Sequence, residues 1–153
     1  MNSASSKELI KAARQYLERG WRTVYIEPGT KKPNRKDWQM LRLSEEDFSE
    51  AFGRSGNIGI ILGEASGGVV DTDIDCPEGL AIADEYLPLT GAETGRPGAL
   101  RSHRWYCTDL SSTVQFRDPV TNDMIIELRS TGGQTLVGPS IHESGEPYDW
   151  LDG

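Results

Sequence analysis

Residues 69–75 read Val-Val-Asp-Thr-Asp-Ile-Asp, so that three acidic residues alternate with β-branched ones. Side chains two positions apart in a strand share a face, and the pattern therefore predicts a strand with Asp71, Asp73 and Asp75 on one side. Carboxylates crowded on one face repel each other unless cations neutralise them, and hard oxygen ligands suit Mg²⁺ or Mn²⁺. The stretch thus predicts a site for two divalent ions.

The alternative for this stretch is a solvated edge strand, whose acids would discourage aggregation. Residues 58–62 form an apolar run, and Val69-Val70 stand directly ahead of the acids. Apolar surroundings of this kind favour a central position in the sheet, where carboxylates need a functional reason.

Apolar spacing and capping residues predict three helices. Ser5 and Glu8 have the spacing of a capping box, and a helix is expected from there to Gly20. Ser44 predicts the start of a short acidic helix. Pro77 predicts the start of a helix that continues to about residue 86.

Strands are expected over residues 21–27, 57–63, 69–75, 102–108, 113–117, 124–129 and 134–137. Turn residues between the fifth and sixth of these predict a hairpin. Helices early and antiparallel strands late indicate an α+β domain, with a mixed sheet and helices packed on one side. The length suits one domain over residues 1–153.

The formal net charge of -8 is unevenly distributed. Residues 1–42 hold 10 Lys and Arg against 4 Asp and Glu, a local excess of positive charge, whereas the remainder is acidic. This asymmetry indicates either a basic arm for an anionic polymer beside an acidic metal pocket, or a solvated helix face. No apolar run of membrane-spanning length and no secretory signal is present, so a cytoplasmic protein with no membrane partner is expected.

Two later segments carry further candidate residues. Arg101, His103 and Trp105 alternate, which predicts a cation and an imidazole on one face of a strand with Ser102 alongside, suited to an anionic ligand. A lone histidine in a strand is more often a structural hydrogen-bonding group. Glu127 lies between hydrophobic residues, so its carboxylate should bind either a metal or the nearby Arg129.

The sequence resembles the primase-polymerase branch of the archaeo-eukaryotic primase superfamily, in its prokaryotic, plasmid and phage form. Five blocks occur in the expected order across residues 8–150: residues 28–33 with Trp38, residues 57–60, the acidic strand through residue 78, residues 101–103, and residues 127–150. The resemblance implies a catalytic sheet related to the RNA-recognition module, joined to a smaller N-terminal unit of helix and strand. Relatives often continue into a helicase, which implies an excised or minimal domain and a helicase domain or protein as an expected partner.

The resemblance also implies roles for particular residues. The acidic pair of the family falls on Asp73 and Asp75 and its later acid on Glu127, and these three are expected to hold two Mg²⁺ or Mn²⁺ ions, with Asp71 as an additional acid. Ser102 and His103 match the motif that contacts the incoming nucleotide. Further nucleotide contacts are expected from Arg101 and from Arg129, which would lie beside the nucleotide or template, and Lys31 and Lys32 are expected to contact phosphate.

The resulting hypothesis is template-directed nucleotidyl transfer on a single-stranded DNA template with nucleoside triphosphates as substrates. The catalytic residues would be Asp73, Asp75, Glu127 and His103. A non-catalytic module that binds nucleotide or single-stranded DNA within a replication protein is an alternative from another class. A metal-dependent phosphodiesterase using the same carboxylates is a third.

Overall fold

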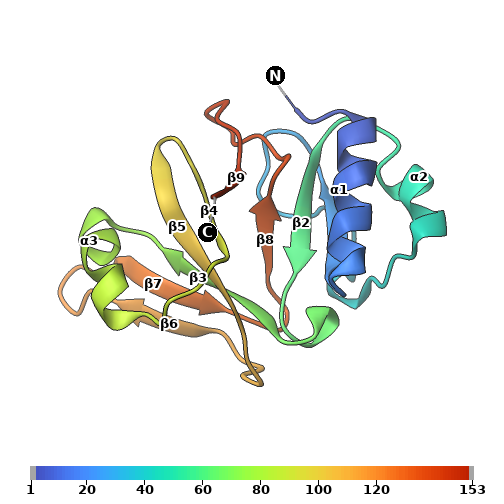
Figure 1. The fold of residues 1–153 in the computed structure, drawn as a ribbon. Helices are drawn as coiled ribbons and strands as arrows, with labels where there is room; N and C mark the ends of the chain where they lie inside the picture. The colour runs from blue at the N-terminus through green and yellow to red at the C-terminus, as the bar shows by residue number, and fades with distance from the viewer. Residues whose placement is uncertain (1–2, 152–153) are drawn as a thin grey trace.

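The computed structural model describes residues 3–151 and divides the strands between two antiparallel sheets (Figure 1). The smaller sheet has the order β1-β2-β8 and consists of β1 (Arg22–Ile26), β2 (Asn57–Ile61) and β8 (Gln134–Val137). The larger sheet has the order β6-β7-β3-β5-β4-β9 and consists of β3 (Val69–Ile74), β4 (Glu93–Arg96), β5 (Ala99–Cys107), β6 (Val114–Arg117), β7 (Met124–Arg129) and β9 (Asp149–Leu151).

Helices cover both sheets. On the smaller sheet lie α1 (Ser6–Glu18) and α2 (Phe48–Ala51), and α3 (Pro77–Tyr86) connects β3 to β4 beside the larger one (Figure 1). Short 3₁₀ turns complete the chain: η1 (Trp38–Met40), η2 (Glu45–Asp47) and η3 (Glu64–Ser66). The predicted capping box is present, because the Ser5 hydroxyl accepts from the Glu8 N–H while the Glu8 carboxylate accepts from the Ser5 N–H.

The main hydrophobic core fills the space between α1, α2 and the smaller sheet. Leu9, Phe52, Ile58 and Ile60 are completely buried there, and Trp105 joins them from the larger sheet. A second cluster on the other face of the smaller sheet contains Val24, Ile26, Ile61, Leu136 and Tyr148. The two sheets are therefore held together by shared apolar packing as well as by the chain.

The chain crosses between the sheets three times, from β2 to β3, from β7 to β8 and from β8 to β9, and the first two crossings lie at nearly the same place. It leaves β2 through η3 to enter β3, and it returns from β7 through residues 130–133 to enter β8. The Leu62 N–H donates to the Gly133 carbonyl at 3.0 Å, which holds the two crossings together. Consequently β8 of the smaller sheet approaches β3 of the larger one, and the Thr135 hydroxyl on β8 reaches Asp71 on β3.

The predicted α+β class with antiparallel strands is confirmed. The acidic strand β3 pairs with β5 on one side and β7 on the other, so it is central and the edge-strand alternative is wrong. The hairpin of β6 and β7 is also confirmed. Two short strands, β4 and β9, were not predicted, and β5 begins three residues earlier than expected.

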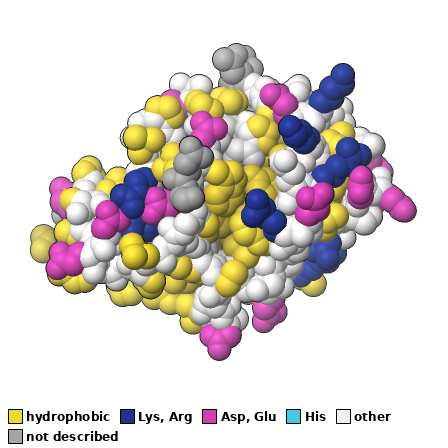
Figure 2. Space-filling view, in the orientation of Figure 1, with side chains coloured by type: hydrophobic (Ala, Val, Ile, Leu, Met, Phe, Trp, Pro, Cys, Tyr) yellow, Lys and Arg dark blue, Asp and Glu magenta, His cyan; other side chains and the backbone are white. Residues whose placement is uncertain are grey.

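The charge asymmetry of the sequence is visible on the surface. On the face in Figure 2, most of the visible Lys and Arg side chains lie over the side of the molecule that carries α1 and α2. None of the helices among residues 3–151 is long and apolar enough to cross a membrane.

Candidate active site

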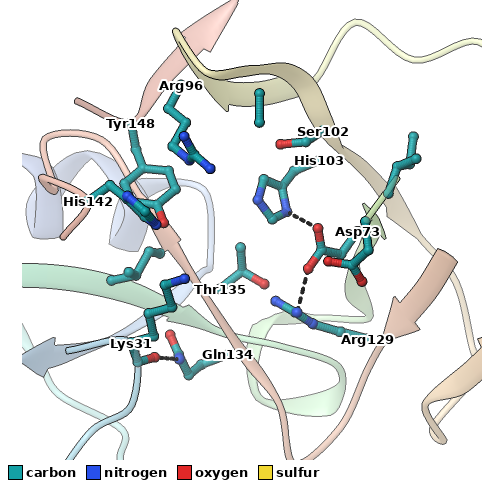
Figure 3. Close-up of a pocket in the computed structure, with 14 residues that line it drawn as sticks. Lys31, Asp73, Arg96, Ser102, His103, Arg129, Gln134, Thr135, His142 and Tyr148 are labelled. Carbon is teal, nitrogen blue, oxygen red and sulfur yellow. Dashed lines mark hydrogen bonds and ion pairs between the residues drawn. The ribbon is translucent and has the colours of Figure 1, made fainter. Parts of the chain in front are cut away.

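A pocket of about 270 Å³, which we call the central pocket, opens where the two sheets meet (Figure 3). The larger sheet contributes residues of β3, β4, β5 and β7, and the smaller sheet contributes β8. Its lining consists of Lys31, Asp73, Ile74, Asp75, Arg96, Ala99, Ser102, His103, Arg129, Gln134, Thr135, Leu136, His142 and Tyr148. Five of the predicted catalytic or nucleotide-binding residues thus converge on one cavity, namely Asp73, Asp75, Ser102, His103 and Arg129.

One wall of the central pocket is acidic. Asp73 lies on β3 with 10% of its side chain exposed, and burial raises its pKa to about 6, although the positive charges of His103 and Arg129 oppose this shift. Asp75 follows the strand, and its pKa is also raised by burial. A raised carboxylate pKa means that ionising these groups costs free energy, which a bound cation would offset.

Arg129, which lies on β7, neutralises part of the negative charge of the acidic wall. Its guanidinium forms an ion pair with Asp73 and donates from Nε to Glu127 Oε2 at 2.8 Å. The strand register places Asp73 directly opposite Glu127, so the guanidinium lies between two carboxylates that face each other across paired strands. Both acids therefore contact a cation in this structure.

His103 is held by a buried carboxylate that was predicted only as an additional acid. Its Nδ1 lies 2.9 Å from Asp71 Oδ2 and 3.5 Å from Asp73 Oδ1. Burial opposes charge on the imidazole, but the two aspartates outweigh burial and raise the pKa of His103. Thr135 on β8 donates to the same Asp71 oxygen at 2.7 Å. Asp71 thereby connects the two sheets beneath the pocket.

The opposite wall carries Lys31, Arg96, His142 and Tyr148 (Figure 3). Arg96 on β4 forms an ion pair with Glu146, which also accepts from the Gly98 N–H. Burial raises the pKa of Tyr148, so its hydroxyl remains protonated and available as a donor. The pocket therefore has carboxylates on one side and cations on the other, with His103 between them.

The structure corrects the expectation that Arg101 shares a face with His103. Arg101 has a φ of 57°, and the β4–β5 pairing shifts register between Thr94 and Arg96, so the alternation of β5 is broken there. Its guanidinium instead contacts Asp84 Oδ1 at 2.8 Å and Glu93 Oε2 at 2.6 Å, outside the central pocket. The side chain belongs to a network that fixes α3 to the larger sheet.

Glu127 and Lys32 lie beside the central pocket rather than in it. Both line a neighbouring groove that shares Lys31, Arg129 and Gln134 with the pocket. Glu127 also accepts from Gln115 at 2.6 Å, and this bond together with that from Arg129 keeps its pKa low despite burial.

The expected metal ligands fit a hard cation in their chemistry. Within residues 3–151, no group of three or more His, Cys, Asp and Glu side chains is spaced to hold a metal ion. The carboxylates of Asp73 and Asp75 nevertheless line one cavity, and Oδ1 of the buried Asp71 lacks a hydrogen-bond partner. Glu127 and Asp73 are joined by ion pairs to the same residue, Arg129, whose guanidinium lies between the two acids.

Several pocket residues were not assigned a role from the sequence, namely Arg96, Thr135, His142 and Tyr148. Three of them belong to segments that read as ordinary turns or unpredicted strands. The only local signal was the motif block of residues 127–150, which contains Thr135, His142 and Tyr148.

Comparison with known proteins agrees with this arrangement. No curated protein matches the chain. The family model described as "Bifunctional DNA primase/polymerase, N-terminal" matches residues 13–153, which covers both sheets and every residue of the central pocket. The chain therefore belongs to the Prim-Pol family, the N-terminal domain of bifunctional DNA primase/polymerases.

Proposed function

We propose that this chain is a template-directed nucleotidyltransferase that joins nucleotides in the central pocket. The observation that carries the proposal is the division of this pocket into an acidic wall and a basic wall, with His103 between them. Nucleotidyl transfer needs an acidic and a basic wall. Cations and hydrogen-bond donors bind the triphosphate, and carboxylates bind its metal ions. Membership of the Prim-Pol family supports the same reaction class.

Asp73 and Asp75, together with Glu127, would hold Mg²⁺ or Mn²⁺ on the acidic wall. When bound, such ions would neutralise phosphate charge and favour attack of a 3′-hydroxyl on the α-phosphate, which breaks the bond between the α- and β-phosphates, releases pyrophosphate and passes the hydroxyl proton to solvent. The raised pKa of Asp73 and the facing position of Glu127 support this assignment. Arg129 pairs with both acids and would contact the nucleotide or the template from the same wall.

The remaining residues would bind and orient the nucleotide. Nδ1–H of His103 is bonded to Asp71, and in the protonated imidazolium that the two aspartates favour, Nε2–H would donate to a phosphate oxygen. Ser102, the residue before His103 on β5, and Arg96 on the opposite wall would supply further hydrogen-bond donors. Catalysis would consist mainly of positioning and charge neutralisation, with no covalent step on the protein.

A primer-extension assay with Mg²⁺ or Mn²⁺ tests the proposal. The double variant Asp73→Asn, Asp75→Asn should lose extension while keeping the wild-type melting temperature. The matched control is Glu46→Gln, Glu50→Gln, which removes two exposed acids outside the central pocket and should extend normally. A wild-type chain that extends no primer and forms no dinucleotide would disprove the reaction.

The second candidate is a non-catalytic module that binds nucleotide or single-stranded DNA. It is favoured by one observation, namely that Arg129 and His103 already neutralise the acids that would hold metal. This function predicts binding of nucleotide that does not depend on Mg²⁺ or Mn²⁺, and no incorporation. Calorimetric titration of nucleotide with and without metal separates the two, because a catalytic site should bind the triphosphate more tightly with metal.

A further inference from the structure

A second cavity of about 720 Å³, which we call the side groove, adjoins the central pocket. Both cavities are lined by Lys31, Arg129 and Gln134, and these three residues therefore separate the side groove from the central pocket. The side groove continues along Lys31, Lys32, Pro33, Trp38, Thr113, Glu127, Arg129, Thr131, Gly132, Gly133 and Gln134. A chain lying in this groove would reach the central pocket at its edge.

The side groove is lined by one aromatic side chain, Trp38, which packs on apolar residues. Trp38 packs against the second hydrophobic cluster, which contains Leu136 and Tyr148, yet it remains half-buried rather than buried. Because Trp38 also lines the groove, the indole is packed against apolar residues and is accessible from the groove. A supported ring of this kind is a stacking surface for a nucleobase, and stacking is tolerant of base identity.

Positively charged side chains of the loop over residues 31–36 lie near the Trp38 ring. Lys31 and Lys32 both line the groove with exposed side chains, and Arg35 and Lys36 follow in the same loop. The Gln134 side chain donates to the Lys31 carbonyl at 2.7 Å, which fixes the loop against β8. Four of the ten Lys and Arg residues of the N-terminal segment thus lie in this loop, where Lys31 also forms an ion pair with Glu143 at 3.3 Å.

The opposite wall leaves room for a backbone. Gly132 has a φ of 90° and open space where a side chain would stand. Glu127 is the one acid that lines the groove within residues 3–151, and its charge is compensated by Arg129. A polyanion would therefore meet cations and a bare glycine turn rather than free carboxylates.

We propose that the side groove binds the single-stranded template, with a base stacked on Trp38 and phosphates bound by Lys31 and Lys32. The role as template rests on the proposed function, whereas binding of a single strand does not. The groove would deliver the strand to the pocket edge at Arg129 and Gln134, which belong to both cavities. The acidic net charge of the chain is compatible with this, because the groove is basic locally.

Fluorescence anisotropy of labelled oligothymidylate, measured over a series of salt concentrations, tests the proposal. Trp38→Ala should weaken binding by roughly ten- to a hundredfold, as expected for loss of one base–aromatic stack. Trp38→Phe should restore most of the affinity. Lys32→Ala should reduce the slope of log affinity against log salt by about 0.7, the value for one phosphate contact on a single strand.

Two matched controls lie outside the groove, an exposed aromatic residue and an exposed lysine. Tyr86→Ala removes a ring that is 71% exposed on α3, and Lys11→Ala removes a cation from α1. Both should bind oligothymidylate like the wild type. Since Lys32 is exposed and makes no ion pair within the described residues, its variant also guards against loss of folding as an explanation.

The outcomes separate this proposal from the proposed function. The Asp73→Asn, Asp75→Asn variant should bind oligothymidylate at least as tightly as the wild type, and the Trp38 and Lys32 variants should keep wild-type nucleotide affinity by calorimetry. The side-groove proposal is overturned if the wild type does not bind the strand, if Trp38→Ala binds normally, or if Tyr86→Ala weakens binding equally. Absence of primer extension would contradict the proposed function but not the binding of a single strand in the side groove.

Discussion

The Nδ1 atom of His103 lies 2.9 Å from Oδ2 of Asp71, a residue with no solvent exposure. A carboxylate can only accept at this position, so the histidine carries its proton on Nδ1 and leaves Nε2 free for a ligand. Thr135 donates to the same oxygen from the other sheet. The orientation of the proposed nucleotide-binding histidine is therefore set by packing between the sheets.

Asp71→Asn should leave the fold intact but weaken the hold on His103, because an amide carries no charge to pair with the imidazole. A charge-assisted hydrogen bond contributes about 1.5–3 kcal/mol, so the KM for nucleotide should rise roughly ten- to a hundredfold. Steady-state primer extension measures it, with kcat separated from KM. Thr135→Ser, which keeps the hydroxyl, should behave like the wild type. An unchanged KM in Asp71→Asn would contradict the positioning role.

Arg96→Ala should weaken nucleotide binding about tenfold, because its guanidinium lines the basic wall of the central pocket. Arg101→Ala is the matched control, since Arg101 pairs with Asp84 and Glu93 outside the pocket. Calorimetry with a nucleoside triphosphate should therefore separate the two arginines. Equal losses of affinity in both variants would show that Arg101 contributes to nucleotide binding although it lies outside the pocket.

Glu93→Gln should destabilise the protein by about 2 kcal/mol near neutral pH, as it removes a charged partner of Arg101 and of the buried Arg104. The hydrogen bond from Arg101 holds the pKa of Glu93 below its ordinary value, so the folded state gains stability above the unfolded pKa and loses it as the pH falls through the folded one. Urea unfolding between about pH 3 and 7 should give a weaker pH dependence in the variant.

The control for this acid-sensitive contact is Glu85→Gln, which removes an exposed carboxylate on the neighbouring helix. Its stability should stay within about 0.5 kcal/mol of the wild type. A Glu93→Gln variant that unfolds like this control at every pH would show that the network does not stabilise the fold.

Gly63→Ala should destabilise the protein by roughly 2–4 kcal/mol, because strain and a steric clash combine. Gly63 has a φ of 71°, and an added Cβ would lie 2.4 Å from the Thr131 nitrogen, where the first two crossings between the sheets touch. Gly67→Ala has a similar φ of 69° in open space and should cost only about 1 kcal/mol. Denaturant unfolding of both variants measures the difference, and equal losses would contradict a tight crossing.

The local elements followed from sequence patterns that act over a few residues. Capping at Ser5, the proline at the start of α3 and the alternation of β3 all depend on near neighbours, and the structure has each where it was expected. The central position of β3 was also predictable, since apolar residues around the acids exclude an edge. The ordered motifs indicated the family, which residues 13–153 match.

The assembly of the site depended on contacts between distant segments. The sequence by itself determined that acids, a histidine and an arginine stand on successive strands, because alternation fixes which side chains can share a face. Only the tertiary structure decided that Arg101 lies outside the central pocket, that Arg96 lines it, and that Thr135 reaches Asp71 across 64 residues. A positive φ, a shift of register and the packing of one sheet on another are set by long-range pairing, which no local pattern encodes.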